Sequence, residues 1–404
     1  MTAVLDRPVT AAPRTLPRGV AFAGISAAMV AILVAAGAPT PLLPIYQAQW
    51  GFPPWVLTLA FGAYAFALLV TIPVVGSLSD HVGRRPLMIG ALALDLVAMV
   101  VFLLSPSVGW LITARVVQGV ATAAASTAVS AAVVELAPER YKKLGAQMTS
   151  LAPLAGLGIG ALYSGLLAQF ASDAAFAVWM VLVVVMSLVT LVAVFTPETA
   201  TRKPGALASL VPRISLPAQV RRLYATTVPG IVSAFMMMTL YMGLVPVVLV
   251  AFFHVHNPVV GALVAFVVFA VGAAVSAFSG TVRPHLLRVA GAGGITAGAV
   301  VFVGSIGAHS LALVWVAAVL TGAGIGAAFA GTTRGLVPEV APHERAGLFT
   351  AVYVVGYAGM GVSAIAAGLV AGLVGPAVMA SWFGVVTAVV ALTGVIATTR
   401  LSRA

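Results

Sequence analysis

Long apolar runs alternate with short polar segments along the whole chain. A helix needs about 20 mostly apolar residues to cross a hydrocarbon core. The run 176–195, FAVWMVLVVVMSLVTLVAVF, has this length and lacks the apolar–polar alternation of strands in a membrane β-barrel. We therefore predict an all-α polytopic membrane protein with twelve transmembrane helices. The expected spans are 19–46, 55–79, 86–104, 109–135, 143–170, 175–196, 223–251, 258–280, 286–305, 310–336, 345–372 and 377–399.

One connection is longer than the others and divides the spans into six and six. Residues 196–222 are polar, proline-rich and basic. The expected units are an N-terminal tail (1–18), an N-terminal six-helix half (19–196), a linker (197–222), a C-terminal six-helix half (223–399) and a C-terminal tail (400–404).

A weak internal repeat supports this division. Segment 133–150 resembles segment 337–353, and each follows the fourth span of its half. Two related six-span halves are an arrangement of secondary transporters, in which the substrate site lies between the halves. The matching residues are Glu135 with Glu339, Pro138 with Pro342, and Gly145 with Gly347.

The composition agrees with a membrane protein and excludes several classes of site. Hydrophobic residues make up 62% of the chain and charged residues 7%, against about 45–50% and about 25% in a soluble domain. There is no cysteine, which excludes disulfides and thiolate metal sites. The six histidines lie in loops or at span ends, so we expect neither a metal site nor a cofactor.

The basic residues predict an orientation. With both termini in the cytoplasm, 19 of the 20 Lys and Arg residues fall in the tails, in the cytoplasmic loops or at adjoining helix ends. This bias follows the positive-inside rule, which also explains the net charge of +11 without a nucleic-acid partner. We expect a multi-pass protein of the plasma or inner membrane, for which a monomer suffices. Arg115 is the exception, because it falls inside a span.

The loop between the second and third spans concentrates charge in a chain that has little. It reads GSLSDHVGRRP, Gly76 to Pro86. Gly83 permits a tight turn, and Gly76 permits close helix packing. Arg84 and Arg85 suit the headgroup region, whereas Asp80 at a helix C-terminus needs a cation nearby.

This loop resembles the signature loop of the major facilitator superfamily. RVVQG (115–119) and ELAPER (135–140) resemble two further elements of that superfamily. The glycine-rich segment 152–165 loosely resembles the fifth-span element of its twelve-span drug:proton antiporters. The resemblance implies a charge cluster of Asp80, Arg84 and Glu135 that latches the two halves on the cytoplasmic side. The corresponding segment of the second half, 279–291, has no acid, so any latch is one-sided.

Two ionisable residues lie within spans, where such residues are functional candidates by default. Asp95 is ten residues, or about 15 Å of helix, beyond Arg85. It could carry a proton, or it could join helices through a hydrogen bond. Arg115 matches the superfamily element implicated in coupling. Its guanidinium stays charged, so it must hold a charge partner, tune a nearby acid or attract an anion. Gln118 lies one turn away on the same face.

A substrate cavity should collect irregular, aromatic and flexible positions near mid-membrane. The prolines of segment 37–47 expose backbone carbonyls, and methionine suits varied apolar ligands. No acid lies near mid-membrane in the spans expected to line the cavity, which favours neutral, lipophilic or weakly anionic cargo. The candidate cavity residues are Tyr64, Arg115, Gln118, Met237, Tyr241 and Tyr357, with Met236, Met238 and Tyr353 beside them.

These features together predict a secondary transporter whose partners are a small molecule, protons and the lipid bilayer. We expect proton-coupled export of lipophilic or amphipathic compounds by alternating access. The alternative is a uniporter or proton symporter of a neutral nutrient such as a sugar. An enzyme is disfavoured because the chain has no H-E-x-x-H, no G-x-S-x-G, no P-loop and no clustered histidines. A sensor is disfavoured because no soluble segment is large enough for a signalling domain.

Overall fold

The computed structural model describes residues 15–76, 78–201, 203–207, 210, 216–341 and 344–401. Within these residues, twelve helical segments are long and apolar enough to cross a membrane, which confirms the predicted number. Some residues that the sequence analysis names or includes in its counts lie outside the described part of the chain: the tail before residue 15, Arg202, Arg213, Pro342, His343 and Arg403.

The first six spans comprise eight α-helices. They are α1 (Arg18–Gly37), α2 (Pro39–Trp50), α3 (Pro54–Val75), α4 (Leu78–Val82), α5 (Arg84–Leu103), α6 (Val108–Leu136), α7 (Lys142–Phe170) and α8 (Ala174–Val194). A 3-10 turn at Glu139–Tyr141 joins α6 to α7. The last six spans are α9 (Arg221–Thr239) with α10 (Val245–Ala251), then α11 (Pro258–Phe278), α12 (Pro284–Gly307), α13 (Leu311–Leu336), α14 (Arg345–Val374) and α15 (Pro376–Leu401).

Two spans are interrupted near their middle. The first breaks at Ala38, because Pro39 has no N–H to donate to the Ala35 carbonyl. The seventh contains a π-helical turn, Leu240–Leu244, between α9 and α10. Such turns are rare and are frequent at functional sites.

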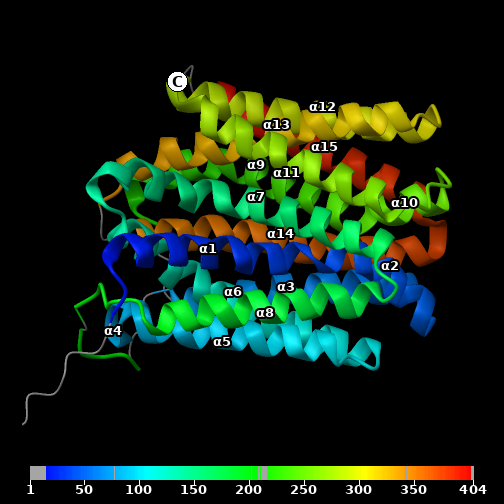
Figure 1. Ribbon diagram of the computed structural model, residues 1–404. Helices are drawn as coiled ribbons and strands as arrows, with labels where there is room; N and C mark the ends of the chain where they lie inside the picture. The colour runs from blue at the N-terminus through cyan, green and yellow to red at the C-terminus, as the bar shows by residue number, and fades with distance from the viewer. Residues whose placement is uncertain are drawn as a thin grey trace, which may run out of the picture.

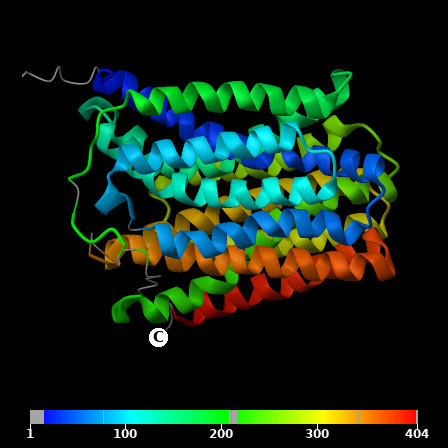
Figure 2. The same cartoon turned by 90° about the horizontal axis from the view of Figure 1, so that it is seen from below.

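The helices form one elongated bundle in which each half contributes helices to a central interface. Helices α1, α5, α6 and α8 pack together, as do α9, α12, α13 and α15. Between the two groups, α7 packs against α11, and α3 packs against α14 (Figures 1 and 2). Large apolar side chains remain exposed on the outside, as expected of a lipid-facing surface; Val70, Phe170, Leu188 and Trp382 are examples.

The two ends of the bundle differ in charge. The loops around α4, after α6, after α8, before α12 and before α14 carry the basic residues and lie together at one end, here called the basic end (left in Figure 1). The ends of α2 and α7 and the start of α11 lie at the other end, here called the far end (Figure 1).

Glycines allow the closest helix contacts. A Cβ at Gly326 of α13 would overlap the backbone oxygen of Gly272 on α11. A Cβ at Gly165 of α7 would overlap Ala262 of α11 at the far end. Small residues at such crossings let helix backbones approach inside a membrane, where packing replaces the hydrophobic effect.

Candidate functional site: a cavity between the halves and a charge cluster at the basic end

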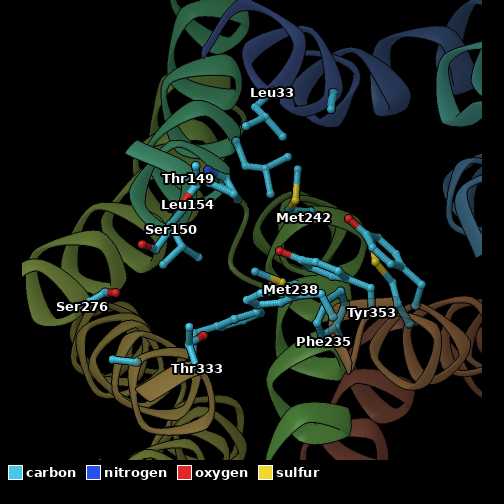
Figure 3. Close-up of a pocket in the computed structure, with 18 of the residues that line it drawn as sticks. Leu33, Thr149, Ser150, Leu154, Phe235, Met238, Met242, Ser276, Thr333 and Tyr353 are labelled. Carbon is cyan, nitrogen blue, oxygen red and sulfur yellow. The ribbon is translucent and has the colours of Figure 1, made fainter. Parts of the chain in front are cut away.

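A cavity of about 320 Å³ lies between the two halves. This volume is within the usual range for small-molecule sites. Its inner wall includes Phe61, Tyr64 and Arg115, and near the basic end it is bordered by Ser150 of α7, Ser276 of α11 and Thr333 of α13 (Figure 3). At the far end α7 and α11 are in contact, as the Gly165–Ala262 approach shows. The cavity therefore faces the basic end and is closed toward the far end.

Arg115 lies at the inner wall of this cavity and is 1% exposed. Its Nε donates to the Ala60 carbonyl at 3.2 Å, and its Nη1 donates to Gln118 Oε1 at 2.8 Å. The guanidinium also stacks over the Tyr64 ring, 4.4 Å from its centroid, and lies 5.7 Å from the centroid of Phe61. The side chain is thereby held in one orientation by two hydrogen bonds and two aromatic faces.

Gln118 and Gly119 of the RVVQG segment each have a specific neighbour. Gln118 Nε2 donates to the Ala35 carbonyl at 2.9 Å, the group left without a helical donor by Pro39. A Cβ at Gly119 would lie 2.7 Å from Ala67 and would overlap the backbone of α3. Gln118 thus joins α6 to the break in α1, while Gly119 lets α6 rest directly on α3 beside Arg115.

Aromatic and methionine side chains from both halves form the rest of the wall. Tyr64 comes from α3, and Tyr353 and Tyr357 come from α14. The rings of Phe235 and Tyr357 are 4.9 Å apart and those of Phe235 and Phe329 5.7 Å, so they form a connected aromatic surface. Met238 and Met242 complete the wall (Figure 3), together with Met360.

The structure places three of the six candidate cavity residues, Tyr64, Arg115 and Tyr357, in the wall. Gln118 lies behind Arg115 and does not line the cavity. Met237 and Tyr241 are fully buried among other helices of the C-terminal half, and the Tyr241 ring packs against Phe302.

The helix of the seventh span presents Met238 and Met242 to the cavity instead of Met237 and Tyr241. The two residues of each pair are four positions apart and so share a helical face. The two pairs lie on adjacent faces of the same helix. The methionine-rich segment does reach the cavity, but which of its faces points there depends on packing. Phe235, Phe329 and Met242 were missed, because nothing in their sequence setting separates them from residues of an ordinary helix core.

The basic end of the N-terminal half holds the predicted charge cluster. Arg84 Nη1 pairs with Asp80 at 2.6 Å, and Arg84 Nη2 pairs with Glu135 at 3.4 Å. Gly83 has φ 110°, a conformation that favours glycine, where the loop turns into α5. Gly76 ends α3, and a Cβ there would lie 3.7 Å from Thr350 Oγ1 on α14, so the two halves approach at this point.

The start of the linker is bound to the same cluster. Glu198 accepts hydrogen bonds from the backbone N–H of Arg84 at 2.9 Å and of Arg85 at 3.3 Å, and so caps the start of α5. Thr199 donates to Glu135 at 2.5 Å, and Arg85 donates to the Val194 carbonyl at the end of α8. Within the described part of the chain, both ion pairs of Arg84 join residues of the N-terminal half, whereas the resemblance implied a latch between the halves.

The C-terminal half has a different arrangement at the basic end. Arg334 of α13 donates to the Ser279 and Gly280 carbonyls, each at 2.6 Å, and lines the mouth of the cavity. Arg334 therefore binds the carbonyl groups of a loop, whereas Arg84 binds carboxylates. This asymmetry agrees with the absence of an acid from segment 279–291.

Asp95 lies away from the cavity wall. It is 0% exposed on α5, a helix that packs against α6 and α8. Within the described residues neither carboxyl oxygen has a hydrogen-bond partner. The interpretation of Asp95 as a residue that joins helices by hydrogen bonding therefore has no bond to support it. The described residues also contain no group of three His, Asp or Glu placed to hold a metal ion.

Comparisons with known proteins agree with this architecture. A family model described as Major Facilitator Superfamily matches residues 24–364. A crystal structure of the human organic anion transporter MFSD10 (TETRAN) has a similar fold, with a TM-score of 0.67 and 17% sequence identity over 94% of this chain and 100% of that chain. No curated protein sequence matches significantly. At this identity the likeness between the structures concerns the fold alone.

Proposed function

The chain belongs to the Major Facilitator Superfamily, and from that premise we propose that it exports small lipophilic or amphipathic compounds in exchange for protons. It is a membrane transporter rather than an enzyme. The observation that carries the proposal is the cavity between the halves, which both halves line and which is closed at the far end. A site in this position can be exposed to one side at a time as the halves rock.

The chemistry of the wall supports apolar cargo over a sugar. Seven aromatic residues and three methionines line the cavity, whereas Gln147 is its single side-chain amide among the described residues. Sugars need several hydrogen-bonding partners, because each buried hydroxyl without one costs free energy. Flexible methionines and flat rings can adapt to varied apolar shapes.

The proposed orientation decides which side of the membrane the cavity faces. The positive-inside rule assigns the basic end to the cytoplasm, with both termini on that side of a plasma or inner membrane. A cavity that faces the basic end would then load from the cytoplasm. Reaction of an impermeant thiol reagent with Lys143→Cys and with His256→Cys in intact cells tests this, since labelling of Lys143→Cys alone would refute it.

Asp95 is the proposed proton carrier, because it is the buried acid of the N-terminal half and has no hydrogen-bond partner among the described residues. The test is proton movement in proteoliposomes that contain a pH-sensitive dye. Lipophilic compounds should trigger proton flux in the wild type and in Glu139→Gln, a control at an exposed ion pair. Asp95→Asn should lose it. Cargo uptake without any proton flux would reject coupling and leave a uniporter.

A further inference from the structure

The cavity contains positive charge and no negative charge. Among the described residues that line it, Arg115 and Arg334 are charged and none is Asp, Glu, Lys or His. Arg115 is not a member of any ion pair between described residues. A charged side chain inside a membrane protein normally pairs with an opposite charge or faces a polar pathway. Arg115 thus faces the cavity without an ionic partner among the described residues, and an anion that enters the cavity can supply one.

Arg115 has donors left for that partner. A guanidinium carries five N–H groups in a planar fork, and the bonds to Ala60 and Gln118 use two of them. The remaining N–H groups can bind both oxygens of a carboxylate in parallel, the geometry that guanidinium groups favour. Because Nε and Nη1 are already fixed, the free edge is oriented before any ligand arrives.

We propose that the cargo is an organic monoanion whose acid group binds Arg115 and whose apolar body lies against Tyr64, Tyr353 and Tyr357. This inference rests on the proposed function and narrows its substrate class. Gln118 acts as a positioning residue, since its side chain connects Arg115 to the break in α1. A carboxylate at Arg115 would have the aromatic and methionine wall beside it, so an aromatic or short alkyl acid fits the site.

Arg334 gives the anion a route to this site. It lines the cavity near the basic end, and its Nη1 and Nη2 are held by the loop carbonyls of Ser279 and Gly280. A cavity with one sign of charge and low-dielectric walls attracts ligands of the opposite sign and raises their association rate. Arg334 thus meets the anion first, and Arg115 binds it at the inner wall.

The test compares acids with amides of the same shape. Binding and uptake are measured with 2-naphthoate and 2-naphthamide, benzoate and benzamide, and octanoate and octanamide, using purified protein in nanodiscs and proteoliposomes. The wild type should prefer at least one acid over its amide by about tenfold or more, as expected when a buried charge gains its partner. This comparison needs no variant and so does not depend on the folding of one.

Two substitutions then test whether Arg115 causes the preference for the acid over its amide. Gln118→Glu places a carboxylate against Arg115 with little change of shape, and Arg115→Gln removes the cation. Each should abolish the preference for the acid, measured as the ratio of acid to amide affinity within the same variant, because the acid then has no unpaired cation to bind. Arg334→Gln should slow acid association relative to amide association and reduce the dependence of the acid rate on salt.

The outcomes separate this inference from the proposed function. Equal binding of acid and amide by the wild type, with transport of both, would overturn the anion inference and leave the exporter. A preference for the acid that persists in Gln118→Glu and Arg115→Gln would overturn the role of Arg115. Failure to transport any acid, amide or neutral lipophile would overturn both proposals.

Discussion

Gly165 offers a direct test of alternating access, because its contact belongs to one conformation. In the structure α7 and α11 meet at the far end, where a Cβ on Gly165 would overlap Ala262 Cβ and lie 3.3 Å from the Pro258 carbonyl. When the halves separate at the far end, this contact opens and the methyl group has space. Gly165→Ala should therefore destabilise the far-end-closed state without a matching effect on the far-end-open state.

The size of the shift follows from the cost of overpacking. Forcing a methyl group into a well-packed contact costs about 1–3 kcal/mol. If that cost falls on one state, the ratio of far-end-closed to far-end-open molecules drops by about 5- to 150-fold. Gly261→Ala is the matched control, because it adds a Cβ to α11 at the same end, where the nearest atoms lie at 3.8–3.9 Å.

The assay exploits the absence of cysteine from the chain. Spin labels on Ser172→Cys and His256→Cys report the separation of the halves at the far end. A second pair, Lys143→Cys and Thr281→Cys, reports it at the basic end. Gly165→Ala should lengthen the first distance and shorten the second, while Gly261→Ala resembles the wild type. Unchanged distances in Gly165→Ala, or an equal change in Gly261→Ala, would refute the role of this contact.

Three further predictions concern stability, and thermal unfolding of the purified protein measures each. Asp95→Leu removes a buried carboxyl group that has no hydrogen-bond partner among the described residues. The substitution should therefore stabilise the protein by about 1–3 kcal/mol and end proton-coupled transport. A loss of stability would contradict this reasoning. Glu198→Ala removes the cap of α5 and should destabilise by about 1 kcal/mol, less at high salt. Gly326→Ala should cost about 1–3 kcal/mol because of its contact with α11, whereas Gly304→Ala, which has open space around it, should not destabilise.

The fold was predictable because the bilayer restricts what a sequence can form. Apolar runs of spanning length gave the twelve spans, and the break at Ala38 follows from the proline that comes after it. The π-helical turn at Leu240–Leu244 had no such signal. It adds a residue to one helical turn without a proline to mark it, and it depends on how α9 and α10 pack on their neighbours.

The candidate site was predictable in part, according to the kind of signal each residue carries. Arg115 and Gln118 stood out because polar groups are rare in these spans, and the structure joins them at 2.8 Å. Asp80, Arg84 and Glu135 stood out for the same reason and form one cluster. Glu198 was overlooked because a carboxylate in a polar linker is ordinary until the linker is seen against the start of α5.

The fixed charge of Arg115 connects the proposed cargo to the energetics of transport. A guanidinium does not release its proton, so an empty cavity remains positive there, and a bound monoanion neutralises it. The loaded and the empty protein would then differ in charge inside the membrane, and at least one of the two reorientation steps must respond to voltage. Outward movement of a monoanion in exchange for one inward proton transfers two charges per cycle, about 4.6 kcal/mol per 100 mV, against about 2.3 kcal/mol for neutral cargo. An inside-negative potential would thus drive proton-coupled export of an anion twice as strongly as export of its amide.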